Sequence, residues 1–521
     1  SFSANQVMTD SASDLERFEK YADSITPEQV YEAFKVKWAG LDSPQLYLST
    51  SLVIEDAENV MMKALADSRA VAVTPLAAQV KADFAYTDFG TPGKVASRET
   101  VEDIEFEQIT FENNVRLNIK KTPYQKDVIS ISVALGQGEL FFPSEYPGFK
   151  WFAPNMLTLA GLEAHSADEI QTIMAGKTVG TSISFGGRRM YMSGATVPGD
   201  LRDQLNLMAA YATAPGYRAE AKSRYDNYIQ SFYPTLDSTP GGVAAKEIDK
   251  LIRSGDARFG IPAQDDLVNI EMESLQSWLD PVLEAQASEI GVVGDVDIDQ
   301  VIKEVARTFG ALPKVEADRP VAADENTALT FPKGSPRPVK LSHAGEVGTA
   351  LLRVYWPAPD GRDVTISREI SMISELFQLR LTEVMREEEG ASYSPSAFSF
   401  SPRLYPDYGY IGASLELDPK DIDRMSAKVD AIAAEFRAGE FDEALLERAI
   451  KPARERIETS LESNGYWMNV ISESQSDSER LERHRSRYEA YQNMTAKQLQ
   501  ARAKTLFDPK TAYRIQVLPE Q

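Results

Sequence analysis

Two residues in one short stretch have side chains that could do chemistry together. Arg386 and Tyr393 lie in the sequence MREEEGASYS, residues 385–394. An arginine guanidinium stays charged at every physiological pH and could hydrogen-bond a peptide carbonyl or a carboxylate, while a tyrosine hydroxyl could donate to an oxyanion. Both residues also have a structural interpretation, in which Arg386 stabilises the end of a helix and Tyr393 packs half-buried. The pattern alone favours that structural interpretation.

Signatures of other catalytic classes are absent from the sequence. The chain contains no cysteine, which excludes disulfides, thiolate metal sites and cysteine nucleophiles. Its three histidines, His165, His343 and His484, are too far apart for two of them to bind zinc from one helix, and their polar neighbours predict surface or loop positions. Neither the G-x-S-x-G motif of serine hydrolases nor the G-x-G-x-x-G motif of dinucleotide-binding proteins occurs.

The charge of the chain limits its partners. Its 521 residues carry a net charge of −24, from 55 Lys and Arg against 79 Asp and Glu. A surface of this sign repels phosphate, so nucleic acid is disfavoured as a partner. No stretch approaches the roughly 18 consecutive apolar residues that a membrane-spanning helix needs, so we expect a soluble chain that does not span a membrane.

The elements that would position these residues follow a repeated pattern, in which a polar turn begins an amphipathic helix and the helix leads into a short strand. The three copies cover residues 24–48, 269–295 and 493–517. In the first copy Thr26 is typical of a helix N-cap, with Gln29 three residues later, and a strand is expected at Gln45–Leu48. Because the third copy ends the chain, we interpret each copy as the end of a domain.

Turn-rich segments predict where the domains begin and end. Residues 1–85 are predicted to be the C-terminal part of a preceding α+β domain, 106–315 a complete domain and 341–521 a second one, with linkers at 86–105 and 316–340. Long helices alternate with strands in hairpin-like succession. This predicts the α+β class, with mostly antiparallel sheets flanked by helices.

Hydrophobic periodicity identifies the clearest single elements. Apolar residues at helical spacing predict a helix from about Asp363 to just before Gly390, a residue that favours a helix end. Alternating polar and apolar residues predict strands at Val128–Leu135, 188–197 and Tyr408–Leu417. Arg386 is therefore expected in the last turn of a long helix.

The Arg386 to Tyr393 segment resembles the second-half signature of the pitrilysin/insulinase-type zinc metallopeptidases, a family with an inverted zinc motif. That signature is an arginine, a polar run, a glycine and a tyrosine. Ile290–Asp297 is similar to the Gly-Asp-Val strand end of the family's domains, and Val354–Pro357 to the opening strand of its last domain. The order and spacing of these matches agree across residues 106–521, and residues 1–85 resemble the tail of the domain before.

The resemblance implies four related α+β domains in two halves that close like a clamshell around an unfolded peptide. In this family an H-x-x-E-H motif of the first domain binds zinc. This sequence has no such motif, and Trp151, Pro154 and Asn155 stand where the two histidines and the glutamate fall in the related third domain. The resemblance therefore implies that this chain holds no metal or other cofactor and that Zn²⁺ is bound by an N-terminal half.

The function that the resemblance implies is that of the C-terminal, non-zinc-binding half of a zinc metalloendopeptidase. Arg386 and Tyr393 would be its catalytic residues, contacting the substrate and the transition state. Its partners would be a peptide substrate and the N-terminal catalytic half, in the same polypeptide or as a separate subunit, and this chain alone would be inactive. Bacterial relatives are often exported, which favours a periplasmic or otherwise exported location.

Two other functions stay open at this point. One is a degenerate, non-catalytic scaffold or peptide-binding subunit of the same fold. The other is a self-sufficient hydrolase that uses a pair of carboxylates, although no local motif supports it.

Overall fold

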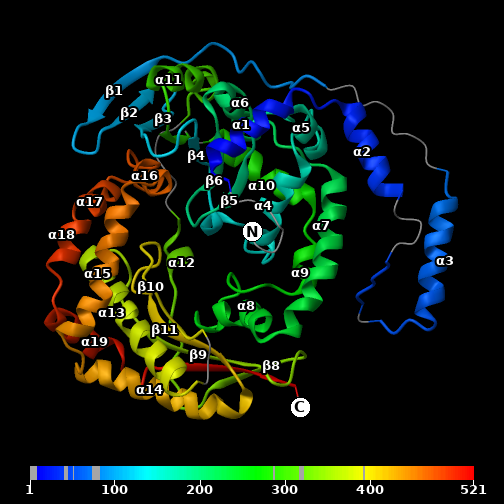
Figure 1. The fold of residues 1–521 in the computed structure, drawn as a ribbon. Helices are drawn as coiled ribbons and strands as arrows, with labels where there is room; N and C mark the ends of the chain where they lie inside the picture. The colour runs from blue at the N-terminus through cyan, green and yellow to red at the C-terminus, as the bar shows by residue number, and fades with distance from the viewer. Residues whose placement is uncertain are drawn as a thin grey trace. The chain divides into compact units, whose positions relative to one another are not determined.

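The computed structural model describes residues 9–39, 45–50, 52–72, 82–285, 288–315, 322–390 and 394–520 (Figure 1). The chain divides into two units, residues 1–80 and 81–521. No helix within these described residues has the length and apolarity that crossing a membrane requires.

The described residues of the first unit form three helices, α1 (Ser11–Ala22), α2 (Pro27–Ala39) and α3 (Ala57–Ala70). The predicted N-cap of α2 is confirmed, because the Thr26 backbone N–H donates to Gln29 Oε1 (3.0 Å) and the Gln29 N–H donates to Thr26 Oγ1 (3.3 Å). The strand predicted at Gln45–Leu48 is wrong, since these residues form no strand. An apolar run becomes a strand only when another strand pairs with its backbone, and sequence periodicity does not supply that partner.

The second unit contains two sheets. The seven strands of the first are β1 (Val95–Val101), β2 (Phe106–Phe111), β3 (Arg116–Lys121), β4 (Ile129–Leu135), β5 (Ser182–Phe185), β6 (Met190–Thr196) and β7 (Glu289–Gly294). The five strands of the second are β8 (Val339–His343), β9 (Ala350–Pro357), β10 (Ser396–Phe400), β11 (Tyr410–Leu417) and β12 (Tyr513–Pro519). We call the segment from β1 to α11 the first lobe and the segment from β8 to β12 the second lobe.

Helices flank both sheets. Those of the first lobe are α4 (Phe149–Ala160), α5 (Ala167–Ile173), α6 (Leu201–Thr213), α7 (Ala219–Phe232), α8 (Pro240–Leu251), α9 (Gln264–Val268), α10 (Met272–Glu284) and α11 (Ile298–Arg307). After the short α12 (Asp324–Thr327), the second lobe has α13 (Val364–Thr382), α14 (Ile422–Ala438), α15 (Glu443–Ser460), α16 (Asn464–Ile471), α17 (Glu479–Arg485), α18 (Arg487–Gln492) and α19 (Ala496–Leu506). The predicted α+β class is confirmed.

The two lobes repeat one topology. The strand order is β1-β2-β3-β7-β4-β6-β5 in the first sheet and β8-β12-β9-β11-β10 in the second, so five strands of the first sheet match the whole second sheet. In both, the one parallel pair joins the first strand of the shared pattern to the last, β3 to β7 and β8 to β12. The predicted helix-then-strand endings are confirmed for the second and third copies, as α10 followed by β7 and α19 followed by β12.

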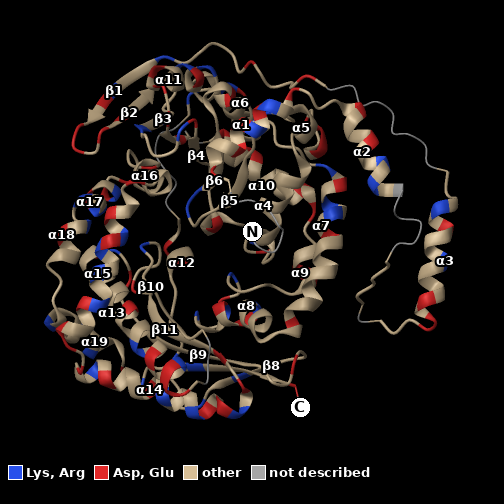
Figure 2. Cartoon of the chain, viewed as in Figure 1, with Lys and Arg blue, Asp and Glu red and all other residues tan. Residues whose placement is uncertain are grey.

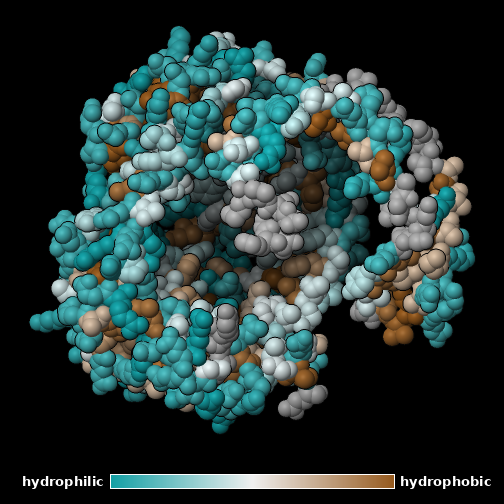
Figure 3. Space-filling view, viewed as in Figure 1, coloured by the Kyte–Doolittle hydropathy of each residue, from teal (hydrophilic) through white to brown (hydrophobic). Residues whose placement is uncertain are grey.

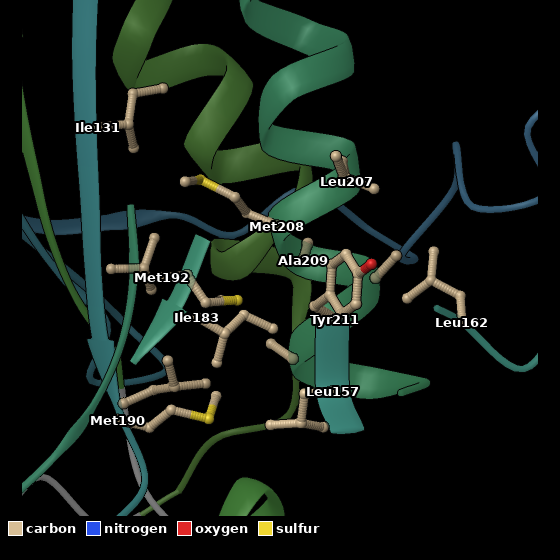
Figure 4. Packing of buried hydrophobic residues seen from close by; sticks show 14 of the residues in the cluster. Ile131, Leu157, Leu162, Ile183, Met190, Met192, Leu207, Met208, Ala209 and Tyr211 are labelled. Atoms are coloured by element: carbon tan, nitrogen blue, oxygen red, sulfur yellow. The ribbon is translucent and has the colours of Figure 1, made fainter. Parts of the chain in front are cut away.

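Each lobe covers one face of its own sheet with its longer helices. In the first lobe the core includes Ile131 of β4, Met192 of β6, Leu157 of α4 and Met208 of α6, all at most 2% exposed (Figure 4). In the second lobe, α13, α14 and α19 pack on β9 and β11 in the same way. The side of the molecule seen in Figure 3 is mostly hydrophilic, with apolar residues visible inside the hollow between the two lobes.

Two equivalent helices cross between the lobes. Helix α8 of the first lobe packs its buried Val243 and Ile248 against Tyr355 and Val517 of the second sheet. Helix α16, at the equivalent place in the second lobe, packs Trp467 and its neighbours against the first sheet at β3, β4 and β7. Each lobe therefore packs a helix against its partner's sheet, and these contacts form hydrophobic clusters across the boundary between the lobes.

A buried polar network fixes the end of α16 on the first sheet. Glu289 of β7 is 2% exposed and accepts hydrogen bonds from Asn118 Nδ2 (2.9 Å) and from the Gln475 backbone N–H (2.9 Å). The Gln475 side-chain amide also donates to the carbonyls of Ile109 and Leu117, at 3.2 Å each. Buried polar groups of this kind specify one arrangement, because any shift would leave them without hydrogen bonds in a dry environment.

The predicted linker 86–105 is wrong in its second half, where strand β1 pairs antiparallel with β2. Side chains of β1 are almost all exposed, so the strand has no apolar alternation for a sequence pattern to reveal. Backbone hydrogen bonds to β2 alone make it a strand. The predicted linker 316–340 likewise ends inside β8, and it contains α12.

Close approach of α16 to β7 gives a stability prediction at Gly291. A Cβ atom there would lie 2.8 Å from the Ser472 Cα and 2.9 Å from Met468 Sδ. We expect Gly291→Ala to destabilise the protein by about 1–3 kcal/mol, because the backbone at Ser472 must move. Thermal unfolding followed by far-UV circular dichroism measures this effect.

The control is Gly241→Ala in the first turn of α8, where an added Cβ meets nothing within 4 Å. This substitution should leave the unfolding temperature unchanged or raise it slightly. Equal unfolding temperatures for the two variants would contradict tight packing of α16 on β7.

Candidate functional site

Helix α13 carries the candidate site at its C-terminal end. The helix begins where the sequence predicts, because the Asp363 carboxylate accepts hydrogen bonds from the backbone N–H groups of Thr365 (2.8 Å) and Ile366 (3.1 Å). Ile373 and Phe377 are fully buried in the core of the second lobe. The helix is therefore fixed along its length before it reaches the candidate residues.

The last turns of this helix widen into a π-helical segment, Glu383–Glu388. Its i to i+5 hydrogen bond is visible where the Glu389 N–H donates to the Val384 carbonyl at 3.1 Å. The segment buries Val384 and Met385 and exposes Arg386. Gly390 follows with a φ of +59°, a left-handed conformation that suits glycine at a helix end. Short π-helical segments are frequent at functional sites.

Only one of the two predicted site residues can be placed. Arg386 is exposed on the π-helical segment, in the last turn of the helix as the sequence predicts. Tyr393 lies outside the described residues. That these two side chains act together therefore stays a prediction.

An arginine on the preceding turn ties the π-helical segment to α14. Arg380 contacts Glu383 (3.1 Å), Glu388 (3.5 Å) and Glu435 of α14 (3.1 Å). The hydrogen bond to Glu435 is the main reason why the pKa of Arg380 is raised, and the guanidinium stays charged. Acidic and basic residues are interspersed along α14 and α15 (Figure 2).

A second ion-pair cluster holds the residue just before Gly390. Glu389 contacts Lys428 Nζ at 2.8 Å and also Arg424, which in turn pairs with Asp421 at 2.8 Å. The hydrogen bond from Lys428 is the largest cause of the lowered pKa of Glu389. This carboxylate therefore stays ionised and attached to α14 at neutral pH.

Gln378, in α13 before the π-helical segment, holds the chain where it enters strand β10. Its Nε2 donates to the Pro395 carbonyl (2.9 Å), and its Oε1 accepts from the Ala397 N–H (2.6 Å) at the start of the edge strand β10. The stretch from residue 383 to residue 395 is thus fixed at both ends, with Arg386 between. Sequence reasoning missed Gln378, Arg380 and Glu389. In the sequence, only the i, i+3 spacing of Arg380 and Glu383 indicates one of these contacts. The contacts with α14 and β10 join residues far apart in the chain, so no local pattern indicates them.

The positions where the resemblance implies the family's zinc ligands lie on α4. Trp151 and Pro154 are half-buried and Asn155 is exposed, with Asn155 Nδ2 donating to the Trp151 carbonyl at 2.7 Å. An indole, a proline ring and an amide engaged with the backbone do not fit a zinc ion, which takes imidazole, thiolate or carboxylate ligands. Across the residues that the structure describes, no group of three or more His, Cys, Asp or Glu side chains could hold a metal ion.

The prediction that the three histidines lie at the surface or in loops is wrong for His343, which is buried in strand β8, whereas His165 lies in a loop as predicted. His165 and His343 are buried, and His484 is half-buried in α17. A ring nitrogen of each one forms a hydrogen bond of 2.7–2.9 Å within the protein. Burial depends on which elements pack around a residue, and flanking residues in the sequence do not report that.

Part of the chain matches a known protein family. Residues 269–452, which run from before α10 into α15, match the family described as the Peptidase M16 inactive domain. No curated protein sequence matches the chain.

Solved structures share the fold over much greater lengths. The ferredoxin protease FusC, crystallised in complex with Arabidopsis ferredoxin, has a TM-score of 0.69 and 16% identity over 100% of this chain. The periplasmic protease PqqL from Escherichia coli has a TM-score of 0.68 and 15% identity over 99% of this chain. A structure of the first half of PqqL also matches, with a TM-score of 0.60 and 14% identity. That match covers 79% of this chain and 92% of the PqqL half. This chain spans 57% of the length of FusC and of PqqL.

Pitrilysin has a TM-score of 0.58 and 16% identity over 82% of this chain and 47% of its own. At these identities the similarity shows the fold. Together with the inactive-domain match, it confirms the predicted resemblance: this chain has the fold of the pitrilysin-type M16 peptidases, with their inactive domain at residues 269–452 and without their zinc motif.

Proposed function

We propose that this chain is the C-terminal, non-zinc-binding half of a zinc metalloendopeptidase that hydrolyses peptides inside a clamshell chamber. The observation that carries the proposal is the fold match over the whole chain to proteases of which it spans just over half, combined with the inactive-domain match. The match to the first half of PqqL supports an enzyme built from two related halves. In the full-length enzyme the other half would bind the Zn²⁺ ion.

In this proposal Arg386 and Tyr393 reach the substrate held between the halves. The Arg386 guanidinium would donate to a peptide carbonyl, and the Tyr393 hydroxyl would donate to the oxyanion that forms at the reacting carbonyl. Support comes from the segment itself, because its two ends are fixed by Arg380 and Gln378 while Arg386 is exposed. Rigid positioning of donors before the reaction is what makes such hydrogen bonds effective.

The proposed domains follow the sequence boundaries. Residues 1–85 would be the C-terminal part of the preceding domain, 106–315 the third domain and 341–521 the fourth. The repeated strand order of the two lobes supports the last two assignments. A periplasmic or otherwise exported location is proposed from the similarity to PqqL, which is a periplasmic protease.

A degenerate scaffold or peptide-binding subunit of the same fold is the second candidate. The observation that favours it is the set of residues at the zinc positions on α4, none of which fits a metal. In this case the chain would bind peptides and partners without contributing to hydrolysis.

The test is cleavage of an unstructured quenched peptide by this chain, by the polypeptide that carries the H-x-x-E-H motif, and by their mixture. We expect cleavage only in the mixture and zinc only with the second polypeptide. Cleavage by this chain alone that resists a chelator would contradict the proposal. An inactive mixture that still binds the peptide tightly would favour the scaffold.

Substitution of the two proposed catalytic residues should slow the reconstituted enzyme. We expect Arg386→Ala and Tyr393→Phe each to lower kcat by about 100-fold, the usual effect of losing one donor to an oxyanion. Zinc content should not change. The control is Arg448→Ala on α15, which removes another exposed arginine; equal turnover for Arg386→Ala and this control would rule out the proposed role.

Gln378 is proposed as a positioning residue for the same segment. Gln378→Ala would remove the hydrogen bonds to Pro395 and Ala397 and loosen the stretch that carries both catalytic residues. We expect kcat to fall by about tenfold while the unfolding temperature and zinc content stay unchanged, because small displacements of catalytic groups are costly. Gln171→Ala, at an exposed glutamine of α5, should have no effect. A loss of stability without a loss of kcat would show that Gln378 is structural only.

A further inference from the structure

A pocket lined by rings lies where the two lobes meet. The loop before α4 supplies Leu140, Phe142 and Tyr146, α4 supplies Phe149, the turn after α8 supplies Phe259, and the turn between β10 and β11 supplies Tyr405. The pocket thus has walls from both lobes. It belongs neither to the Arg386 segment nor to the zinc-equivalent positions.

The rings of this pocket meet edge to face. The centroids of Phe142 and Phe149 lie 5.0 Å apart at 63°, and those of Phe259 and Tyr405 lie 6.0 Å apart at 71° across the lobe boundary. Trp278 packs behind Phe142 at 5.1 Å. Walls that present ring edges and faces favour another ring as their occupant, because aromatic pairs gain from offset and T-shaped contacts.

Tyr405 supplies a polar atom to this pocket. The residue is only 8% exposed, and it lines the pocket. Burial raises its pKa, so the hydroxyl keeps its proton at neutral pH. A ligand carbonyl that enters the pocket can accept a hydrogen bond from this hydroxyl.

The turn that carries Tyr405 is held in place. Asp360 is 8% exposed, and its carboxylate accepts from the Asp407 N–H at 2.7 Å and from Arg362 at 2.7 Å. The Tyr408 hydroxyl donates to the Ile252 carbonyl of the first lobe at 2.8 Å. Tyr405 is therefore positioned before any ligand arrives.

Charged groups at the pocket already have partners. Lys150 pairs with Glu139 at 3.0 Å, and Arg258 pairs with Asp256 at 2.6 Å and donates to the Asn326 carbonyl at 2.6 Å. Since these charges are neutralised within the protein, the pocket favours an uncharged ligand group. A neutral ring that enters with a carbonyl oxygen beside it fits both the walls and the Tyr405 hydroxyl.

We propose that this pocket binds an aromatic side chain of the peptide substrate, with the Tyr405 hydroxyl donating to a peptide carbonyl oxygen. The inference rests on the proposed function, which supplies the peptide. It adds a preference for substrates with an aromatic residue and assigns that preference to the boundary between the two lobes.

The experiment measures binding of two unstructured peptides to the 521-residue chain by isothermal titration calorimetry. The peptides differ only by a Phe→Ala exchange at one central position. We expect the phenylalanine peptide to bind roughly 10–100 times more tightly, the gain from burying one such side chain. Tyr405→Phe should weaken its binding roughly 2–10-fold, the effect of one neutral hydrogen bond.

Two matched variants keep the test independent of folding. Ala257→Trp, at an exposed position on the pocket, should fill it and remove the preference for phenylalanine, whereas Ala175→Trp on a distant exposed turn should not. Tyr211→Phe changes a tyrosine of similar burial (7%) outside the pocket and should leave binding unchanged.

Equal affinity for both peptides, or full preference retained in Ala257→Trp, would overturn the pocket assignment while leaving the proposed peptidase role intact. A clear preference that Ala257→Trp abolishes would support the assignment. If that preference is found and the reconstituted mixture cleaves nothing, the peptidase proposal fails and the pocket remains as a peptide-binding site.

Discussion

The exchange of α8 and α16 is the constraint on which the second unit depends. Each sheet has a second face that its own helices leave open, and the equivalent helix from the other lobe covers it. Because each lobe covers a face of the other's sheet, the contact between them stabilises both lobes. At Gly291 the contact is close enough to exclude even a methyl group. The buried Glu289–Gln475 network then fixes one position of α16 on the first sheet. Any other position would leave buried polar groups without hydrogen bonds.

This shared interior decides where functional groups can lie. Helix α13 packs on the second sheet and leads into the π-helical segment, which Arg380 and Glu389 fix to α14. The aromatic pocket lies instead at the junction itself, because only there do loops of both lobes converge. The second unit therefore carries two separate features: the segment with the exposed Arg386, and an aromatic pocket at the junction of the lobes.

Much of the fold could be predicted from local physics. The capping pair Thr26 and Gln29, the alternation of β4 and the helical spacing of α13 are properties of neighbouring residues, and all three elements form as expected. The strand at Gln45–Leu48 and the linker over β1 failed for the same reason. Whether a short segment becomes a strand depends on a second strand that pairs with its backbone. Among the described residues, the apolar run Gln45–Leu48 has no such pairing strand, whereas the polar β1 pairs with β2.

For the site, the sequence by itself determined the residue types: no cysteine, no zinc motif, and an arginine, glycine and tyrosine at a family-like spacing after a long helix. Residue types and their spacing along the chain are properties of the sequence and do not depend on how the chain folds. The tertiary structure decided that the helix ends in a π-helical segment clamped to α14 and β10, that two histidines are buried, and that Tyr405 meets Phe259 across the lobes. These features join residues tens to hundreds of positions apart, and such contacts follow from packing two sheets and two exchanged helices into one interior rather than from any local pattern.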